Sequence, residues 1–186
     1  MTKKRFSTRD IILAGLFCGL MIVGANLRIP FALVPLTFQP FFAVLSGLLL
    51  GPALASLSMS AYILLGLAGL PVFASSGAGI SYVLQVSFGF LIGFLLSAWV
   101  SGTIANGKNR PTFARMLSAS AAGLVAIYAV GILYMYGIQS FYLAKSVTLF
   151  SLAKVMLPFF LKDAVLFAGA SLLAARLVPL LRVNRI

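Results

Sequence analysis

The chain has almost no acidic residues and no histidine. Asp10 and Asp163 are its only carboxylates, set against fourteen lysines and arginines in 186 residues. Histidine and carboxylate side chains supply most general acids, general bases and metal ligands, so an active site or metal centre has few possible residues here. The single cysteine, Cys18, cannot form an internal disulfide or a metal site. The sequence therefore predicts neither an enzyme nor a protein with a bound metal or cofactor.

Composition indicates a membrane protein. Hydrophobic residues make up 62% of the chain and charged residues 9%, and the mean hydropathy of +1.12 would leave a soluble domain without a polar coat. The apolar runs are long and continuous, which favours helices of about 20 residues over the alternating strands of a barrel. We predict a single, all-α, polytopic membrane domain over residues 1–186. Its six expected transmembrane helices are about Arg9–Leu27, Phe38–Leu50, Ala53–Leu70, Tyr82–Thr103, Thr112–Gly137 and Leu152–Leu181.

Basic residues gather at three points of the chain: before the first expected helix, after the fourth and at the end of the sixth. An even number of helices places all three groups on one side, and the positive-inside rule makes that side, with both termini, cytoplasmic. The net charge of +12 then reflects topology and attraction to anionic lipid headgroups, and no nucleic-acid partner is expected. A cleavable secretory signal is the alternative for the N-terminus, but its removal would leave an odd number of helices. The three groups are Lys3, Lys4, Arg5 and Arg9; Lys108, Arg110 and Arg115; and Arg176, Arg182 and Arg185.

Three irregular segments fall on the opposite side of the membrane, namely Pro35–Pro40, Gly69–Phe73 and Ser75–Gln85. Irregular backbone at membrane depth persists only when it is buried in protein or lines a cavity, because lipid cannot satisfy its N–H and C=O groups. Asp163, beside Lys162 at the expected start of the last helix, lies on this same side. An ionisable group within a membrane segment costs about 2.5–3.5 kcal/mol, so a partner is expected for it. The three irregular segments and the Lys162–Asp163 pair, all on one side of the membrane, together predict a pocket there.

The segment Pro35–Phe73 resembles the biotin-binding S component, BioY, of energy-coupling factor (ECF) transporters. Gly77–Phe94 and Pro158–Asp163 are similar to the family's glycine-rich entry into the fourth helix and to the start of its last helix. The resemblance implies a six-helix protein of the prokaryotic plasma membrane that captures a vitamin outside the cell. The partners that it implies are biotin as ligand, an ECF T component and two ABC ATPases.

The resemblance also gives a hypothesis for the ligand-binding residues. Many members have proline at Val86 and lysine at Leu166, and these departures leave Lys162 as a candidate basic partner. Biotin has a ureido ring with N–H donors and a C=O acceptor, a thioether ring, and a tail that ends in a carboxylate. The candidates are Gln39, Gln85 and Asp163 for the ureido edge; Phe73, Tyr62 and Tyr82 for the rings; Lys162 or Arg28 for the carboxylate; and Gly77 and Gly79 in the glycine-rich segment.

Each of these assignments has a simpler alternative. Asp163 and Lys162 could instead be only an ion pair at the start of a helix, at the membrane interface, with the lysine side chain extending toward the headgroups. Gln39 and Gln85 could instead form hydrogen bonds between helices. Arg28 could instead anchor the chain at the membrane interface. An S component for another vitamin and an autonomous secondary carrier also stay open, although no internal repeat supports a carrier.

The first expected helix carries small residues spaced four apart, Ala14 with Cys18 and Gly15 with Gly19. Small residues at this spacing allow two helices to approach closely in lipid. Such a stripe resembles the surface by which S components bind their T component, and packing within the chain is the alternative. We therefore expect a docking face on this helix.

Overall fold

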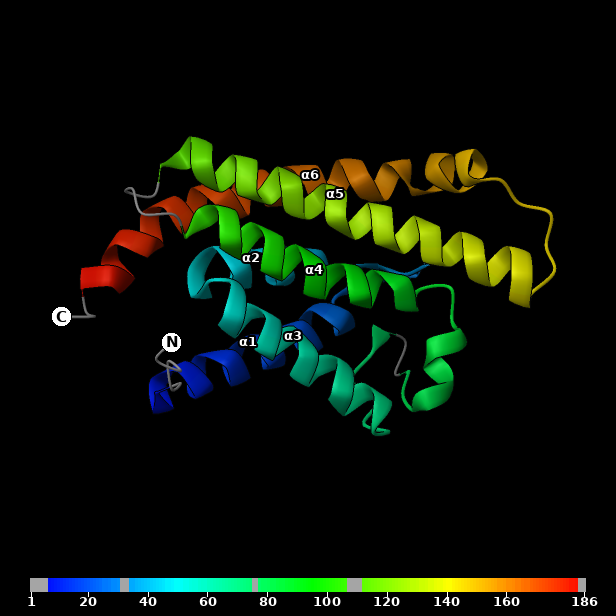
Figure 1. Ribbon diagram of the computed structural model, residues 1–186, viewed down its shortest axis with the longest axis horizontal. Coiled ribbons are helices and arrows are strands. Elements are labelled where there is room, and N and C mark those ends of the chain that lie inside the picture. Colours follow the sequence, from blue (N-terminus) through cyan, green and yellow to red (C-terminus); the bar gives the residue numbers. More distant parts are fainter. Residues whose placement is uncertain (1–6, 31–33, 75–76, 107–111, 184–186) are drawn as a thin grey trace, which may run out of the picture.

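The fold is almost wholly helical (Figure 1). The computed structural model describes residues 7–30, 34–74, 77–106 and 112–183. A short antiparallel hairpin, β1 (Arg28–Ile29) and β2 (Leu36–Thr37), follows the first helix. A 3-10 helix, η2 (Ile80–Leu84), precedes the fourth, and a π-helical stretch, η3 (Ile138–Tyr142), extends the fifth. The helices are α1 Thr8–Asn26, α2 Gln39–Leu50, α3 Pro52–Leu67, α4 Phe88–Ala105, α5 Phe113–Gly137 and α6 Leu149–Val183.

Local sequence signals explain where several helices begin and end. Ser7 and Asp10 form a capping box at the start of α1, in which each side chain accepts a hydrogen bond from the other residue's backbone N–H. Gly51, at φ +83°, separates α2 from α3, and Pro52 follows it as the first residue of α3. Glycine adopts this backbone conformation at little cost, and proline favours the first turn of a helix.

The expected all-α fold with six helices is confirmed, but the expected start of α4 and the expected place of Asp163 in α6 were wrong. α4 begins at Phe88 instead of Tyr82, because Gly79 at φ +84° sends the chain into η2 first. α6 begins at Leu149, close to the expected Leu152, and Asp163, which was expected near the start of this helix, lies fourteen residues inside it. Pro158 lies within α6, and the helix continues past it. The charged pair is therefore interior to a long apolar helix, which argues against a simple pair at a helix end.

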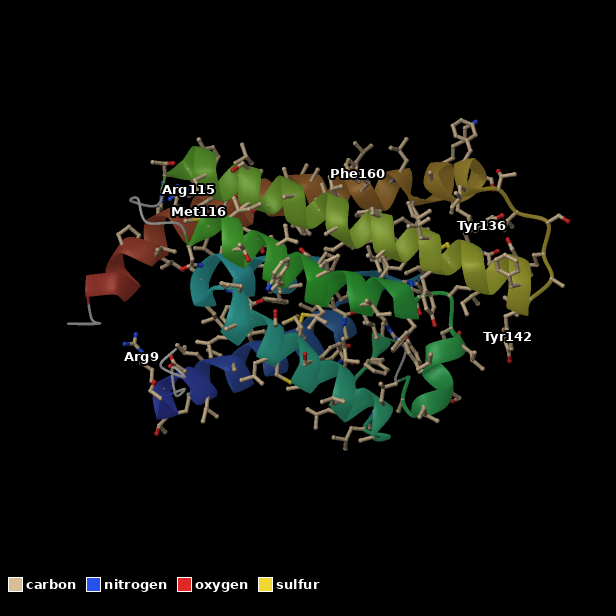
Figure 2. The ribbon with its side chains drawn as sticks, viewed as in Figure 1. Arg9, Arg115, Met116, Tyr136, Tyr142 and Phe160 are labelled. Carbon is tan, nitrogen blue, oxygen red and sulfur yellow. The ribbon has the colours of Figure 1, made fainter. Side chains whose placement is uncertain are left out.

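Four of the described helices are long and apolar enough to cross a membrane: α1, α4, α5 together with η3, and α6. α2 has 12 residues and α3 has 16, so the crossing of all six helices remains a prediction. Arg9 and Arg115 lie at one end of the bundle, and Tyr136 and Tyr142 lie at the other (Figure 2). This arrangement agrees with basic groups on one side, and its assignment to the cytoplasm remains a prediction. Lys3, Lys4, Arg5, Lys108, Arg110 and Arg185 lie outside the described residues.

α4 is the central helix and packs against α2, α3 and α5. Small residues make this close packing possible. A Cβ atom on Gly93 would lie 2.9 Å from the backbone oxygen of Ile127 on α5, and one on Gly47 of α2 would lie 2.2 Å from Ser101 Oγ on α4. Helix association in lipid depends on such close approach. The same packing holds α2, α4, α5 and α6 around the pocket described next.

Candidate ligand-binding pocket

A partly open cavity lies between α2, α4, α5 and α6 and is closed on one side by the β1–β2 hairpin segment. The space that no atom fills, counting the part open to solvent, is about 530 Å³. Its walls are mostly apolar, with a few polar groups among them, as is usual for small-molecule sites. The lining residues are Val34, Pro35, Thr37, Gln39, Pro40, Ala74, Tyr82, Ser87, Phe90, Leu91, Phe94, Ile127, Tyr128, Met156, Phe159, Lys162 and Asp163.

Asp163 is the buried charge of this pocket, with a relative exposure of 2%. Tyr128 of α5 donates a 2.8 Å hydrogen bond to its Oδ2 atom. Lys162 Nζ lies 2.6 Å from its Oδ1 atom and forms an ion pair with it. Oδ1 is itself buried, and beyond the ion pair with Lys162 no described residue donates a hydrogen bond to it. A carboxylate oxygen has two lone pairs, so one that is held by a single ammonium group can accept a further hydrogen bond.

Lys162 also holds the hairpin segment against α6. Its Nζ donates a 2.6 Å hydrogen bond to the backbone carbonyl oxygen of Thr37 in β2. The side chain is 23% exposed, lines the pocket and lies between α6 and the hairpin. Lys162 thus contacts both a buried carboxylate and a carbonyl oxygen, and it joins two elements that are 125 residues apart in the sequence.

A second set of hydrogen bonds centres on Gln39 at the start of α2. Its Nε2 donates to the hydroxyl of Tyr62 at 2.7 Å, and that hydroxyl donates to the carbonyl oxygen of Val72 at 3.1 Å. Thr37 Oγ1 lies 3.4 Å from Gln39 Oε1, which is at the long end for a hydrogen bond. One amide N–H and the carbonyl oxygen of Gln39 therefore retain hydrogen-bonding capacity at the pocket wall.

An aromatic cluster supports the same wall. Phe73 packs edge-on against Tyr62 at 5.6 Å and lies 4.6 Å from the ring of Tyr82, measured between ring centroids. The hydroxyl of Tyr82 lies 3.3 Å from Ser87 Oγ, and both residues line the pocket. Gly77 lies against this ring, since a Cβ atom there would come within 2.1 Å of Tyr82. The wall at Tyr82 depends on a glycine at this position.

The structure brings some of the expected site residues together and leaves others apart. Gln39, Tyr82, Lys162 and Asp163 line the pocket, and Tyr62 and Phe73 lie directly behind its wall. Gly77 and Gly79 border the turn that carries Tyr82, and the backbone N–H of Gly79 donates to the Gly66 carbonyl at 2.7 Å. Gln85 and Arg28 are exposed and do not belong to the lining, so nothing in the geometry supports the hypothesis that they touch a ligand.

Tyr128 and Ser87 were absent from the sequence-based candidates. Tyr128 stands in a long apolar run of α5, and the run was interpreted as a generic membrane helix. The available signal was the place of Tyr128 near the middle of that run, since Tyr134 and Tyr136, the other tyrosines of α5, lie near its end. A phenol in an apolar segment needs a hydrogen-bond partner when buried, and the isolated carboxylate of Asp163 was the obvious candidate.

The small residues of α1 do not form one face. Ala14 and Cys18 are buried, and the Ala14 carbonyl accepts a 2.7 Å hydrogen bond from Ser58 of α3. Gly15 and Gly19 are exposed, and a Cβ atom on either would meet nothing within 4 Å. Consecutive helical residues point about 100° apart, which separates the two pairs. Ala14 and Cys18 pack inside the chain, so only Gly15 and Gly19 remain candidates for docking.

The chemistry of the pocket suits the binding of a neutral ring compound. It combines apolar walls with the polar side chains of Gln39, Lys162 and Asp163. In the described part of the chain, no group of three or more His, Cys, Asp or Glu side chains is placed to hold a metal ion.

The fold is that of ligand-binding S components of membrane importers. The crystal structure of the S-component for biotin from an ECF-type ABC transporter superposes with a TM-score of 0.77, covering 93% of this chain and 94% of that one at 22% sequence identity. A family model described as the BioY family matches residues 1–183, and the chain belongs to this family. It is therefore a multi-pass membrane protein.

Curated relatives agree along most of the chain. The biotin transporter BioY of Thermotoga maritima is 38% identical over 172 residues, which cover 92% of this chain and 97% of that protein. The probable biotin transporter BioY of Lysinibacillus sphaericus is 44% identical over 133 residues, or 72% of this chain and 67% of that protein.

Proposed function

We propose that this chain is the substrate-binding S component of an ECF-type importer and that its ligand is biotin. Family membership and relatives that are named biotin transporters support the ligand class. The observation that carries the proposal is Asp163, a buried carboxylate that lines the pocket and whose Oδ1 has only Lys162 as a partner among the described residues. A ureido N–H of biotin is the donor that this oxygen would accept.

The remaining polar groups of the pocket fit the rest of the ring. Gln39 lies on the facing element, α2, and its amide can donate to the ureido carbonyl or accept from the second N–H. Apolar and aromatic residues, including Phe90, Phe94 and Tyr82, would cover the thioether ring. Each polar group left unpaired in such a site costs about 1–3 kcal/mol, so ring compounds that lack these donors should be rejected.

Transport requires partners that drive the bound vitamin across the membrane. The S-component fold supports a T component and two ABC ATPases as these partners. Gly15 and Gly19 of α1, exposed and without neighbouring side chains, are the docking residues in this proposal. The chain itself would bind and release biotin without covalent chemistry, as a single domain and not as an enzyme or an autonomous carrier.

The test of this function is equilibrium binding of labelled biotin to the purified protein in detergent. Unlabelled biotin should displace the label, and thiamine or riboflavin at the same concentration should not. No displaceable binding of labelled biotin, with saturable binding of labelled thiamine or riboflavin, would instead identify an S component for another vitamin.

A further inference from the structure

The only cation that lines the described part of the pocket is already engaged. Lys162 Nζ lies 2.6 Å from Asp163 Oδ1 and 2.6 Å from the Thr37 carbonyl oxygen. If it moved to a ligand, it would leave Asp163 buried at 2% exposure without its counter-charge. Removing one partner of a buried ion pair is strongly unfavourable, because the remaining charge is uncompensated. Lys162 is therefore a poor receptor for an additional anion.

The charges of the pocket also balance without a ligand. Lys162 contributes one positive charge and Asp163 one negative charge, and the other described lining residues are uncharged. Arg28, the second cation considered for a ligand carboxylate, is exposed in β1 and does not line the pocket. A carboxylate carried into this space would lose its hydration and find no unpaired positive charge among the described lining residues.

We infer that this pocket recognises the neutral ring of its ligand and does not recognise the carboxylate of the tail. The inference rests on the proposed function and extends it to a substrate class: cyclic ureas with free N–H donors whose tails end in a carboxylate, an amide or an ester. The tail would extend toward the part of the pocket that is open to solvent, where its end remains hydrated.

The first test needs only the wild-type protein. Biotin, its primary amide and an analogue methylated on both ureido nitrogens compete with labelled biotin. The amide should bind within about threefold of biotin, whereas the methylated analogue, which has no donor for Asp163, should bind at least about tenfold more weakly. A hydrogen-bonded contact to the carboxylate would make the amide roughly 10- to 150-fold weaker, and that result would overturn the inference.

A second test asks directly whether Lys162 contacts the carboxylate of the tail. Lys162→Met is compared with Lys154→Met, which changes an exposed lysine on the same helix that lies over the ring of Phe150. Lys162→Met should weaken biotin and its amide by the same factor, and Lys154→Met should weaken neither. A loss for biotin that the amide does not share would mean that Lys162 binds the carboxylate, and the inference would then be wrong.

The two proposals fail in different ways. If the wild-type protein binds neither biotin nor the amide, the proposed function is overturned together with this inference. If it binds biotin tightly and discriminates against the amide, the proposed function stands and the inference alone fails. Should Lys162→Met not fold, the comparison of the three ligands on the wild-type protein still decides the question.

Discussion

Tyr128 on α5 donates a 2.8 Å hydrogen bond to Oδ2 of Asp163 on α6, and this bond fixes the orientation of the carboxylate at the pocket wall. With Oδ2 bonded to the phenol, Oδ1 pairs with Lys162 and has no further partner among the described residues. Both residues lie well inside long apolar helices, where a carboxylate is costly unless it is paired and hydrogen-bonded. Tyr128 therefore supports Asp163 both energetically and in orientation.

Tyr128→Phe should weaken biotin binding about tenfold or more, since a hydrogen bond to a charged group contributes about 1.5–3 kcal/mol. Equilibrium binding of labelled biotin measures the change. Tyr136→Phe is the matched control, because Tyr136 is on the same helix and does not line the pocket. It lies at the opposite end of α5 from Arg115 (Figure 2). Equal affinities for the two variants would show that Tyr128 does not orient Asp163 for the ligand.

Gly77→Ala should disturb the pocket wall at Tyr82. The added Cβ atom would come within 2.1 Å of the Tyr82 ring, so the ring must move, at a cost of about 1–3 kcal/mol for overpacking. We expect weaker biotin binding with normal membrane insertion. Gly15→Ala is the control, since a Cβ atom there meets nothing within 4 Å. Unchanged affinity of Gly77→Ala would mean that the position of Tyr82 is unimportant for binding.

Leucine at Gly15 or Gly19 should reduce co-purification with the T component and leave biotin affinity unchanged, because both positions are exposed on α1 and lie outside the pocket. Gly169→Leu provides the control, since Gly169 is an exposed glycine of α6 with nothing within 4 Å of its added Cβ atom. If all three variants co-purify with the T component as the wild type does, α1 does not carry the docking face.

Sequence patterns predicted the helices well where proline, glycine and long apolar runs mark their ends. The break at Gly51 and Pro52 and the pairing of Lys162 with Asp163 are both found in the structure. Helix rotation could not be predicted in the same way. Ala14 and Gly15 are both small, yet one is buried beneath Ser58 and the other is exposed, and only packing between α1 and α3 decides which.

The start of α4 shows a second limit. Tyr82 and Gln85 continue smoothly into an apolar run, so both were expected on one helix with their side chains toward the ligand. Gly79 at φ +84° instead starts a 3-10 turn, which places Tyr82 on the pocket wall and leaves Gln85 exposed. A single backbone angle thus redirects the side chains that follow it, and the apolar pattern carries no information about that angle.

Biotin binding by Asp163→Asn, beside the wild-type protein, tests the central claim most directly. The amide keeps the shape of the side chain but replaces one acceptor oxygen by a donor and removes the charge that pairs with Lys162. The account predicts that the purified wild type binds labelled biotin and that this variant loses at least about tenfold in affinity, in line with the value of a hydrogen bond to a charged group. Equal affinity of the two proteins would contradict the account, because the carboxylate would then have no part in holding the ligand.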